Sequence, residues 1–358
     1  MMPATSLQRV FRFRGGLLLA SAMFAIAGCS AEQEGSDVAA SEAPSDGVGI
    51  SRLDPRLDSL IESDARPEVV TSGYGFLEGP VWVNGALWFS DLMRDKLYGF
   101  EPGGEVRLLL DNSGGGASEA AGDYPGSNGA VPYLNGSVLM AQHGARRIVR
   151  INQDMTVTPF IERDAEGRRL NSPNDLVFGP DGALWFTDPA FGLPLFNEDP
   201  AKEIPYNGVY RWKDGKLTAA ITDLPNPNGI GLSPDGARLY VSNSGPEMFV
   251  MVYDLGKDGK PTNPRRLIEY DIPRPNDVPD GLKVDSLGNI WSSGPGGIRI
   301  ITPEGAVLGQ IKTPEPAQAN LVWGGPGLRT AYIMSSDKVY QLALKVSGLA
   351  PLYGEQGD

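Results

Sequence analysis

Residues 174–188 read NDLVFGPDGALWFTD, which is a polar residue, an apolar stretch, a turn and a second apolar stretch. Two apolar stretches around a Pro-Asp-Gly turn are typical of a β-hairpin. The turn glycines of successive copies of this pattern are 51, 46, 54, 52 and 39 residues apart. The pattern occurs six times, and its first residue is Glu78, Asn128, Asn174, Asn228, Asp280 or Asn320. The chain therefore contains a sixfold internal repeat.

Further β-like stretches follow the hairpin in most copies, at residues 96–100, 147–151, 208–212 and 249–253. Four short strands in a repeat of about 40–50 residues are typical of a β-propeller blade. We therefore expect an all-β fold, a six-bladed β-propeller. A strand at residues 67–72 is expected to pair near residues 339–344 and close the ring. The alternatives are a two-domain β protein and a solenoid, which would need polar capping repeats.

The first residues of the chain indicate a targeting segment. Three arginines precede an apolar stretch at residues 16–27, as in a secretory signal peptide. Ile26-Ala27-Gly28-Cys29 resembles the bacterial lipobox, which implies cleavage before Cys29 and lipidation of its thiol. An ordinary signal peptide is the alternative. Ser30 in place of Asp implies sorting to the outer membrane, so we expect a lipoprotein on its periplasmic side.

These features divide the chain into three parts. We expect a signal peptide at residues 1–28, the lipidated Cys29 with a flexible acidic tether at residues 29–50, and the propeller domain at residues 51–358. No apolar run long enough to span a membrane follows the tether. Any contact with the membrane is therefore expected to go through the lipid anchor alone.

Composition excludes several classes of function. The chain has 358 residues, a net charge of −13, one cysteine and one histidine. A nucleic-acid-binding protein needs a basic face, so this charge argues against that class. A single cysteine allows no internal disulfide and no Cys-rich zinc site. An acidic surface also disfavours anionic substrates, although local charge can reverse that preference.

The first residues of the six copies are candidate site residues. Equivalent positions in equivalent blades lie at equivalent places around the propeller axis, so these residues should form a ring at one mouth of the channel. Buried carboxylates are costly without partners, and a bound cation offsets that cost. Oxygen donors of this kind suit a hard cation, Ca²⁺ first, with Mg²⁺ or Mn²⁺ as alternatives. The competing interpretation is that Asn or Asp before Gly only forms Asx-turns that begin each strand.

Five segments carry a resemblance to a known family. They are Glu78-Gly-Pro-Val-Trp, Leu170-Asn-Ser-Pro-Asn-Asp, Trp185-Phe-Thr-Asp, Asn228-Gly-Ile and Pro279-Asp-Gly-Leu. Together they resemble the senescence marker protein/gluconolactonase/luciferin-regenerating enzyme family over residues 70–345. The resemblance implies a bacterial gluconolactonase-like lipoprotein: a propeller with a divalent metal at the channel mouth that hydrolyses a sugar-type lactone.

The resemblance also implies roles for single residues. Glu78, Asn228 and Asp280 match the metal ligands of the family, and Asn174 matches a further ligand or a substrate contact. Asn128 matches a position that contacts substrate or a metal-bound water. Asp280 is the expected general base for the attacking water. The expected cofactor is one divalent cation, with Ca²⁺ first and Mg²⁺, Mn²⁺ or Zn²⁺ as alternatives.

His143 is the only histidine and a second catalytic candidate, because a histidine base titrates near neutrality. The alternative is a hydrogen-bonded turn residue. A Ser-His-Asp triad is not expected, since no Gly-x-Ser-x-Gly elbow is present. The glycine run 114–116 indicates a loop and not a phosphate cradle, since no Gly-Lys-Ser/Thr follows it. Asp91, Asp188 and Asp337 also recur in the repeat, and we expect them to cap turns.

Two other functions stay open from the sequence. One is a non-catalytic propeller that binds a metal, a metabolite or a protein. The other is an esterase or organophosphate hydrolase that uses the same metal site. The loops at residues 114–126 and 197–207 are expected to form the wall of the pocket and to decide the substrate.

Overall fold

Six small antiparallel sheets make up the structure, a computed structural model that describes residues 47–116, 122–271 and 277–353. In the first four sheets the strands follow chain order from the inner to the outer edge. These strands are β3 (Leu77–Val83), β4 (Ala86–Asp91), β5 (Lys96–Phe100) and β6 (Val106–Asp111); β7 (Ser127–Tyr133), β8 (Ser137–Gln142), β9 (Arg147–Ile151) and β10 (Val157–Ile161); β11 (Leu176–Phe178), β12 (Leu184–Asp188), β13 (Gly208–Lys213) and β14 (Lys216–Ile221); and β15 (Pro227–Leu232), β16 (Arg238–Ser244), β17 (Met248–Leu255) and β18 (Pro261–Glu269).

The last two sheets each take a strand from the N-terminal part of the chain. The fifth contains β19 (Leu282–Val284), β20 (Ile290–Ser292), β21 (Ile298–Ile301) and β22 (Val307–Lys312), and β1 (Gly49–Arg52) adds to its outer edge. The sixth contains β23 (Gln318–Gly324), β24 (Thr330–Ser335) and β25 (Lys338–Ala343), completed by β2 (Glu68–Ser72). The pairing of β2 with β25 confirms the expected closure. The fifth strand β1, which begins at Gly49, was not expected.

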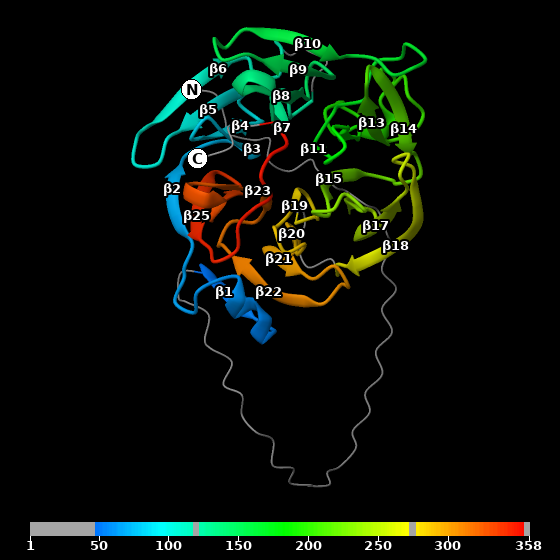
Figure 1. The fold of residues 1–358 in the computed structure, drawn as a ribbon. Helices are drawn as coiled ribbons and strands as arrows, with labels where there is room; N and C mark the ends of the chain where they lie inside the picture. The colour runs from blue at the N-terminus through cyan, green and yellow to red at the C-terminus, as the bar shows by residue number, and fades with distance from the viewer. Residues whose placement is uncertain (1–46, 117–121, 272–276, 354–358) are drawn as a thin grey trace, which may run out of the picture. The chain divides into compact units, whose positions relative to one another are not determined.

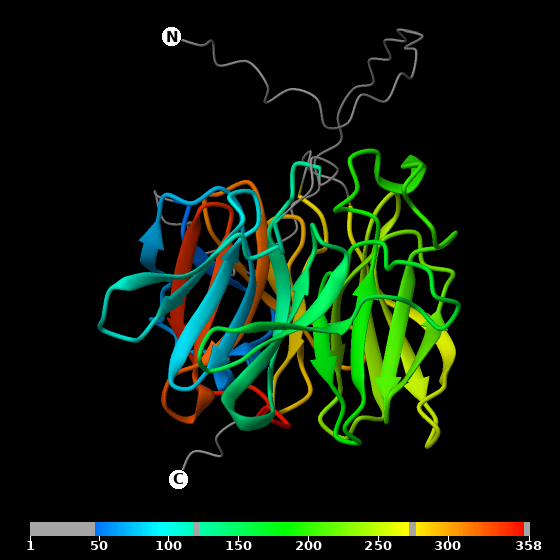
Figure 2. The ribbon, with the colours of Figure 1, turned by 90° about the horizontal axis from the view of Figure 1, so that it is seen from above.

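The six sheets form a closed ring, so the prediction of a six-bladed β-propeller is confirmed (Figure 1). Each inner strand contacts the inner strands of its two neighbours, in the cyclic order β3, β7, β11, β15, β19, β23 and back to β3. The strands run along the axis of this ring (Figure 2). Apolar side chains fill the space between neighbouring sheets; Trp185 of β12, for example, packs with Leu239 and Val241 of β16. This burial supplies the main favourable term for folding.

The turn glycines explain why the repeat is so regular. All six have positive φ, from +63° at Gly136 to +88° at Gly288. This left-handed backbone is open to glycine and costly for most other residues. The only helices in the described ranges are short 3₁₀ turns: η1 (Pro55–Ser59), η2 (Leu134–Gly136), η3 (Phe196–Glu198) and η4 (Pro326–Leu328). None of the helices described has the length and apolar character needed to cross a membrane.

Candidate functional site

The six polar residues of the repeat form a ring around the channel. Four lie near the beginning of inner strands, and Asn174 and Asp280 lie two residues before β11 and β19. Asp280 is partly buried, and the other five are buried. They are joined around the ring by Gly129 N–H to Asn174 O at 2.7 Å, Gly229 N–H to Asp280 O at 3.0 Å, Gly281 N–H to Ala319 O at 2.7 Å and Asn320 Nδ2 to Glu78 Oε2 at 3.0 Å.

Local irregularities aim these side chains at the axis. The pairing register shifts beside the ring residue in β3, β7, β15 and β23. A β-bulge of this kind commonly turns a side chain toward an active site. A side-chain Cβ on Gly79 would lie 1.9 Å from Asn128 O, and one on Gly229 would lie 2.4 Å from Asp280 O. The glycine after a ring residue is therefore required for close approach of the next blade.

Two carboxylates face each other across this ring. Burial raises the pKa of Glu78, and it raises the pKa of Asp280 well above its usual value. The negative charge of Glu78 and a hydrogen bond with it raise the pKa of Asp280 further. Asn228 and Asn320 each donate to one of the two carboxylates. No basic side chain is paired with either carboxylate among the described residues.

Two amide oxygens at the ring have no hydrogen-bond partner. Oδ1 of Asn128 and Oδ1 of Asn228 are both buried and unpartnered. Orphaned buried acceptors are uncommon in native proteins and call for an explanation. Two carboxylates that repel each other and two free amide oxygens form a donor set that suits a hard divalent cation.

A cation site at this ring would need the amide oxygens as ligands, because it contains few carboxylates. The described residues contain no cluster of three or more His, Cys, Asp or Glu side chains that would hold a metal by themselves. Of this donor set, Glu78, Asn228 and Asp280 are expected ligands, and the other free amide oxygen belongs to Asn128 and not to Asn174, the fourth expected ligand. Asn320 differs from these four because it uses both ends of its amide: Nδ2 donates to Glu78, and Oδ1 accepts from Leu321 N–H at 2.9 Å.

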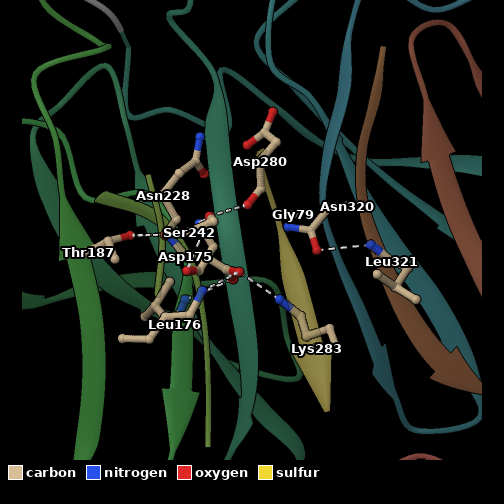
Figure 3. Close-up of polar contacts among 12 residues, drawn as sticks. Gly79, Asp175, Leu176, Thr187, Asn228, Ser242, Asp280, Lys283, Asn320 and Leu321 are labelled. Atoms are coloured by element: carbon tan, nitrogen blue, oxygen red, sulfur yellow. Dashed lines mark hydrogen bonds and ion pairs between the residues drawn. The ribbon is translucent and has the colours of Figure 1, made fainter. Parts of the chain in front are cut away.

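A second pair of charged residues in the channel was missed by the sequence analysis. Lys283 Nζ lies 2.7 Å from Asp175 Oδ2, and Asp175 Oδ1 accepts from Leu176 N–H at 2.9 Å. In Figure 3 the side chains of Asn228 and Asp280 project away from this ion pair. The two partners are 108 residues apart in sequence, so no spacing indicates the pair. The weak signal is position: Asp175 follows Asn174, and Lys283 follows Asp280 by three residues.

His143 lies beside the segment that leads to Asn174. It is 1% exposed, and its Nδ1 is 3.1 Å from Pro173 O. Because a carbonyl oxygen only accepts, Nδ1 carries the proton of the neutral ring and Nε2 does not. Burial lowers the pKa of His143 to about 4. The ring is therefore neutral near pH 7, and its Nδ1–H bond to Pro173 O is the contact expected of a hydrogen-bonded turn residue. A role as general base stays a prediction.

Of the three aspartates expected to cap turns, Asp91 does so by accepting from Arg94 N–H at 3.2 Å, whereas Asp188 holds the chain before β11. Asp188 accepts from Asn171 N–H at 2.8 Å and from Ser172 N–H at 2.9 Å. Burial raises the pKa of this carboxyl to about 7. Asp91 accepts from Gly75 N–H at 2.9 Å and fixes the chain that enters β3. Both residues position the chain that carries a ring residue.

Parts of the two expected wall loops lie near the ring. Burial raises the pKa of Tyr124, and the charges of Asp123 and Asp280 raise it further, which places Tyr124 within electrostatic reach of Asp280. Asn197 Nδ2 donates to Asn226 Oδ1 at 3.2 Å, two residues before Asn228. Residues 117–121 of the first loop, and Cys29 with the whole targeting segment, lie outside the described residues.

Comparison with known proteins gives a consistent result. Residues 76–337 match the model of the SMP-30/Gluconolactonase/LRE-like region. A gluconolactonase of Zymomonas mobilis is 37% identical over 84% of this chain and 87% of its own length. The structure of a gluconolactonase from Xanthomonas campestris is 29% identical, with a TM-score of 0.71 over 84% of this chain and 96% of that one. Regucalcin from Agrobacterium tumefaciens, a calcium-binding protein, shares the fold at 18% identity, with a TM-score of 0.62 over 78% of this chain and 94% of that one.

Proposed function

This chain belongs to the SMP-30/gluconolactonase/LRE-like family, and from that premise we propose that it is a lactonase, a hydrolase that opens the ester bond of a sugar lactone. Two relatives at 37% and 29% identity are named gluconolactonases. The observation that carries the proposal for this chain is the buried pair Glu78 and Asp280 beside two unpartnered amide oxygens. A scaffold that binds no cation would have no need for two buried carboxylates without a cationic partner on its axis.

The proposed cofactor is one divalent cation, Ca²⁺ first, held by Glu78, Asn174, Asn228 and Asp280. The preference for Ca²⁺ follows from an all-oxygen donor set. When bound, such a cation polarises the lactone carbonyl and stabilises negative charge on its oxygen. Asn320 positions Glu78 through its 3.0 Å hydrogen bond and does not itself bind the ion.

The side chains of this protein supply proton transfer and orientation. Asp280 accepts a proton from the attacking water, whose oxygen bonds to the carbonyl carbon. The ring C–O bond then breaks, the proton passes to the leaving oxygen, and the product is a hydroxy acid. Asn128 and Asn174 orient the hydroxyl groups of the substrate. His143 holds Pro173 and so acts as a positioning residue for Asn174.

Hydrolysis of D-glucono-1,5-lactone tests this function. Activity would be measured above the spontaneous rate, after chelation and after Ca²⁺, Mg²⁺, Mn²⁺ or Zn²⁺ is restored. We expect chelation to abolish activity and one divalent cation to restore it. Tight cation binding without hydrolysis of this or other sugar lactones would overturn the lactonase and direct the search to other esters. Hydrolysis that survives complete chelation would overturn the role of the cation.

We also propose, from the sequence of residues 26–30, that the mature protein is a lipoprotein on the periplasmic side of the outer membrane. Replacing Cys29 with Ser removes the thiol that would carry the lipid. The variant is expected in the soluble periplasmic fraction, and the unchanged protein in the membrane fraction. Equal partition of the two proteins would contradict the anchor.

A further inference from the structure

Four arginines line a cavity in the loops between the second and third blades. The cavity has a volume of about 340 Å³, and its wall includes Arg146, Arg147, Arg163 and Arg169 with a single acidic residue, Glu162. The chain as a whole carries a net charge of −13, so the positive charge of this cavity is opposite in sign to that of the chain. No residue of the polar ring lines this cavity.

Two of the arginines are presented by a small, rigid hairpin. Arg163 and Arg169 face each other across an isolated β-bridge. Inside this loop the Asp164 carboxylate accepts from the N–H groups of Glu166 at 3.0 Å and Arg168 at 2.8 Å, and it forms an ion pair with the Arg168 side chain. The Asp164 and Arg168 side chains therefore fix the turn, together with one hydrogen bond from the Arg163 side chain to Gly167 O. Such preorganisation lowers the cost of binding a ligand.

Arg146 is fixed at the back of the cavity. Its Nε donates to the carbonyl oxygens of Leu170 at 2.8 Å and Asn171 at 3.0 Å, and its Nη1 donates to Ala201 O at 2.9 Å. The residue is only 5% exposed, yet Nη2 has no hydrogen-bond partner. Burial and then the charge of Arg169 lower the pKa of Arg146, so the two cations lie close enough to repel each other.

These positive charges are only partly balanced within the protein, because Asp188, Glu203 and Asp199 act on Arg146 through their charge without forming an ion pair with it. Only Arg147 has a carboxylate partner, Glu162 at 3.2 Å, while Arg146, Arg163 and Arg169 form no ion pair with any described residue. Arg163 donates to Gly167 O at 2.7 Å and Arg169 donates to Ala145 O at 3.2 Å. A guanidinium has five N–H donors, so most donors of these two exposed side chains stay free.

We propose that this cavity is a second ligand site, which binds a small molecule through a phosphate, sulfonate or carboxylate group. Guanidinium groups match the geometry of such oxyanions and bind them with charge-assisted hydrogen bonds. The volume lies at the lower end of the range for small-molecule sites, so the cavity has room for a phosphorylated sugar or sugar acid. Gly115 and Gly116 of the glycine run also line it. This inference does not depend on the lactonase activity.

The site is coupled to the polar ring through one segment of chain. Arg146 contacts the carbonyls of residues 170 and 171, and the same segment reaches Asn174 three residues later. An oxyanion that engages Arg146 therefore acts on the same loop that Asp188 and His143 hold.

Isothermal titration calorimetry at constant ionic strength tests the site, with sodium phosphate, D-gluconate and 6-phospho-D-gluconate as probes. The test variant is Arg163→Gln/Arg169→Gln, and the matched control is Arg107→Gln, an exposed arginine on β6. All three arginines are exposed, so both variants should fold, which thermal unfolding would verify. We expect at least one probe to bind the unchanged protein and the control equally, and the double variant about tenfold or more weakly.

Two results would overturn the proposal: failure of every probe to bind, or an unchanged Kd in the double variant. Equal binding of phosphate and 6-phospho-D-gluconate would identify a free anion as a sufficient ligand. Binding of the sugar acids alone would identify the acidic group of a sugar. Because the readout is binding and not turnover, failure of this site and failure of the proposed lactonase are distinguishable.

Discussion

The channel of this propeller contains two groups of buried charged side chains, and only one of them has an ion-pair partner. The Asp175 carboxylate is paired with Lys283 and accepts three hydrogen bonds on its two oxygens, from Leu176 N–H, Ile230 N–H and Lys283 Nζ. Glu78 and Asp280 interact with each other and with amide donors, and neither forms an ion pair with a described residue, although the charge of Lys283 favours ionised Glu78. Two amide oxygens beside them have no partner. Both groups lie on inner-strand segments of the same fold.

The difference shows which group needs a ligand. A buried carboxylate with a cationic partner is balanced within the chain. A pair of buried carboxylates without one is stable only when protonated or when a cation from outside supplies the charge. We therefore expect the inner ion pair to be structural and the polar ring to be the group that takes a ligand.

Asp280→Asn tests the polar ring and should have the largest effect on activity of the variants proposed. The amide keeps the shape but cannot accept a proton, so turnover of the lactone should fall by about 100-fold to 10,000-fold. The measurement is the steady-state rate in excess Ca²⁺, with the exposed Asp223→Asn as the matched control. A loss of less than about tenfold would remove Asp280 from the role of base.

Lys283→Met removes the cation of the inner ion pair and so tests the other side of the comparison. The change leaves the Asp175 carboxylate, whose side chain is 2% exposed, without its cation. The free energy of unfolding should drop by about 3–5 kcal/mol in urea denaturation of chelated protein. Cation binding at the polar ring should survive, because Lys283 itself opposes a positive ion there. A loss of cation binding in a folded variant would show that the two groups are one site.

His143→Gln tests how burial of a charged group near the polar ring makes the free energy of unfolding depend on pH. The pKa of His143 is lowered from 6.5 to about 4 in the folded state, so the unfolded chain takes up the proton first. The stabilising effect of neutral His143 is present above pH 6.5 and is lost as pH falls toward 4. Relative to the variant, the unchanged protein should lose about 3 kcal/mol of unfolding free energy over this window.

Turnover of the same variant decides the role of His143. A positioning residue predicts a rise in KM and a fall in kcat that stays well below the roughly 100-fold expected of a general base. A flat stability difference between pH 6.5 and 4 would contradict the burial of the ring. A large kcat loss that follows the pH profile of an essential base would restore the catalytic interpretation.

Much of the fold could be predicted because the repeat is visible in local sequence. The hairpin pattern identified the inner two strands of each blade, and periodicity alone placed six polar residues on one ring. The strand at residues 67–72 was predicted from the stretch before Glu78, where it could pair near residues 339–344 and close the ring. Strand β1 was missed because Gly49–Arg52 continues a polar, glycine-containing segment with little apolar pattern.

The parts that could not be predicted depend on contacts between distant residues. The Asp175–Lys283 pair joins the third and fifth blades, and the glycines after Glu78, Asn128 and Asn228 approach the next blade closely beside the bulges of their strands. The arginine cavity depends on residues 115–116, residues 144–147 and a hairpin whose bridge, Arg163 to Arg169, is not marked by any turn dipeptide. Spacing shows neither which charges pair nor which remain free.

Isothermal titration calorimetry of chelated protein with Ca²⁺ tests the central claim most directly. The unchanged protein and Asp175→Asn should each bind one divalent cation per chain, and Glu78→Gln should bind none while remaining folded. That result would establish that the uncompensated ring, and not the paired charges beside it, holds the ion. No binding by the unchanged protein, or unaltered binding by Glu78→Gln, would contradict it.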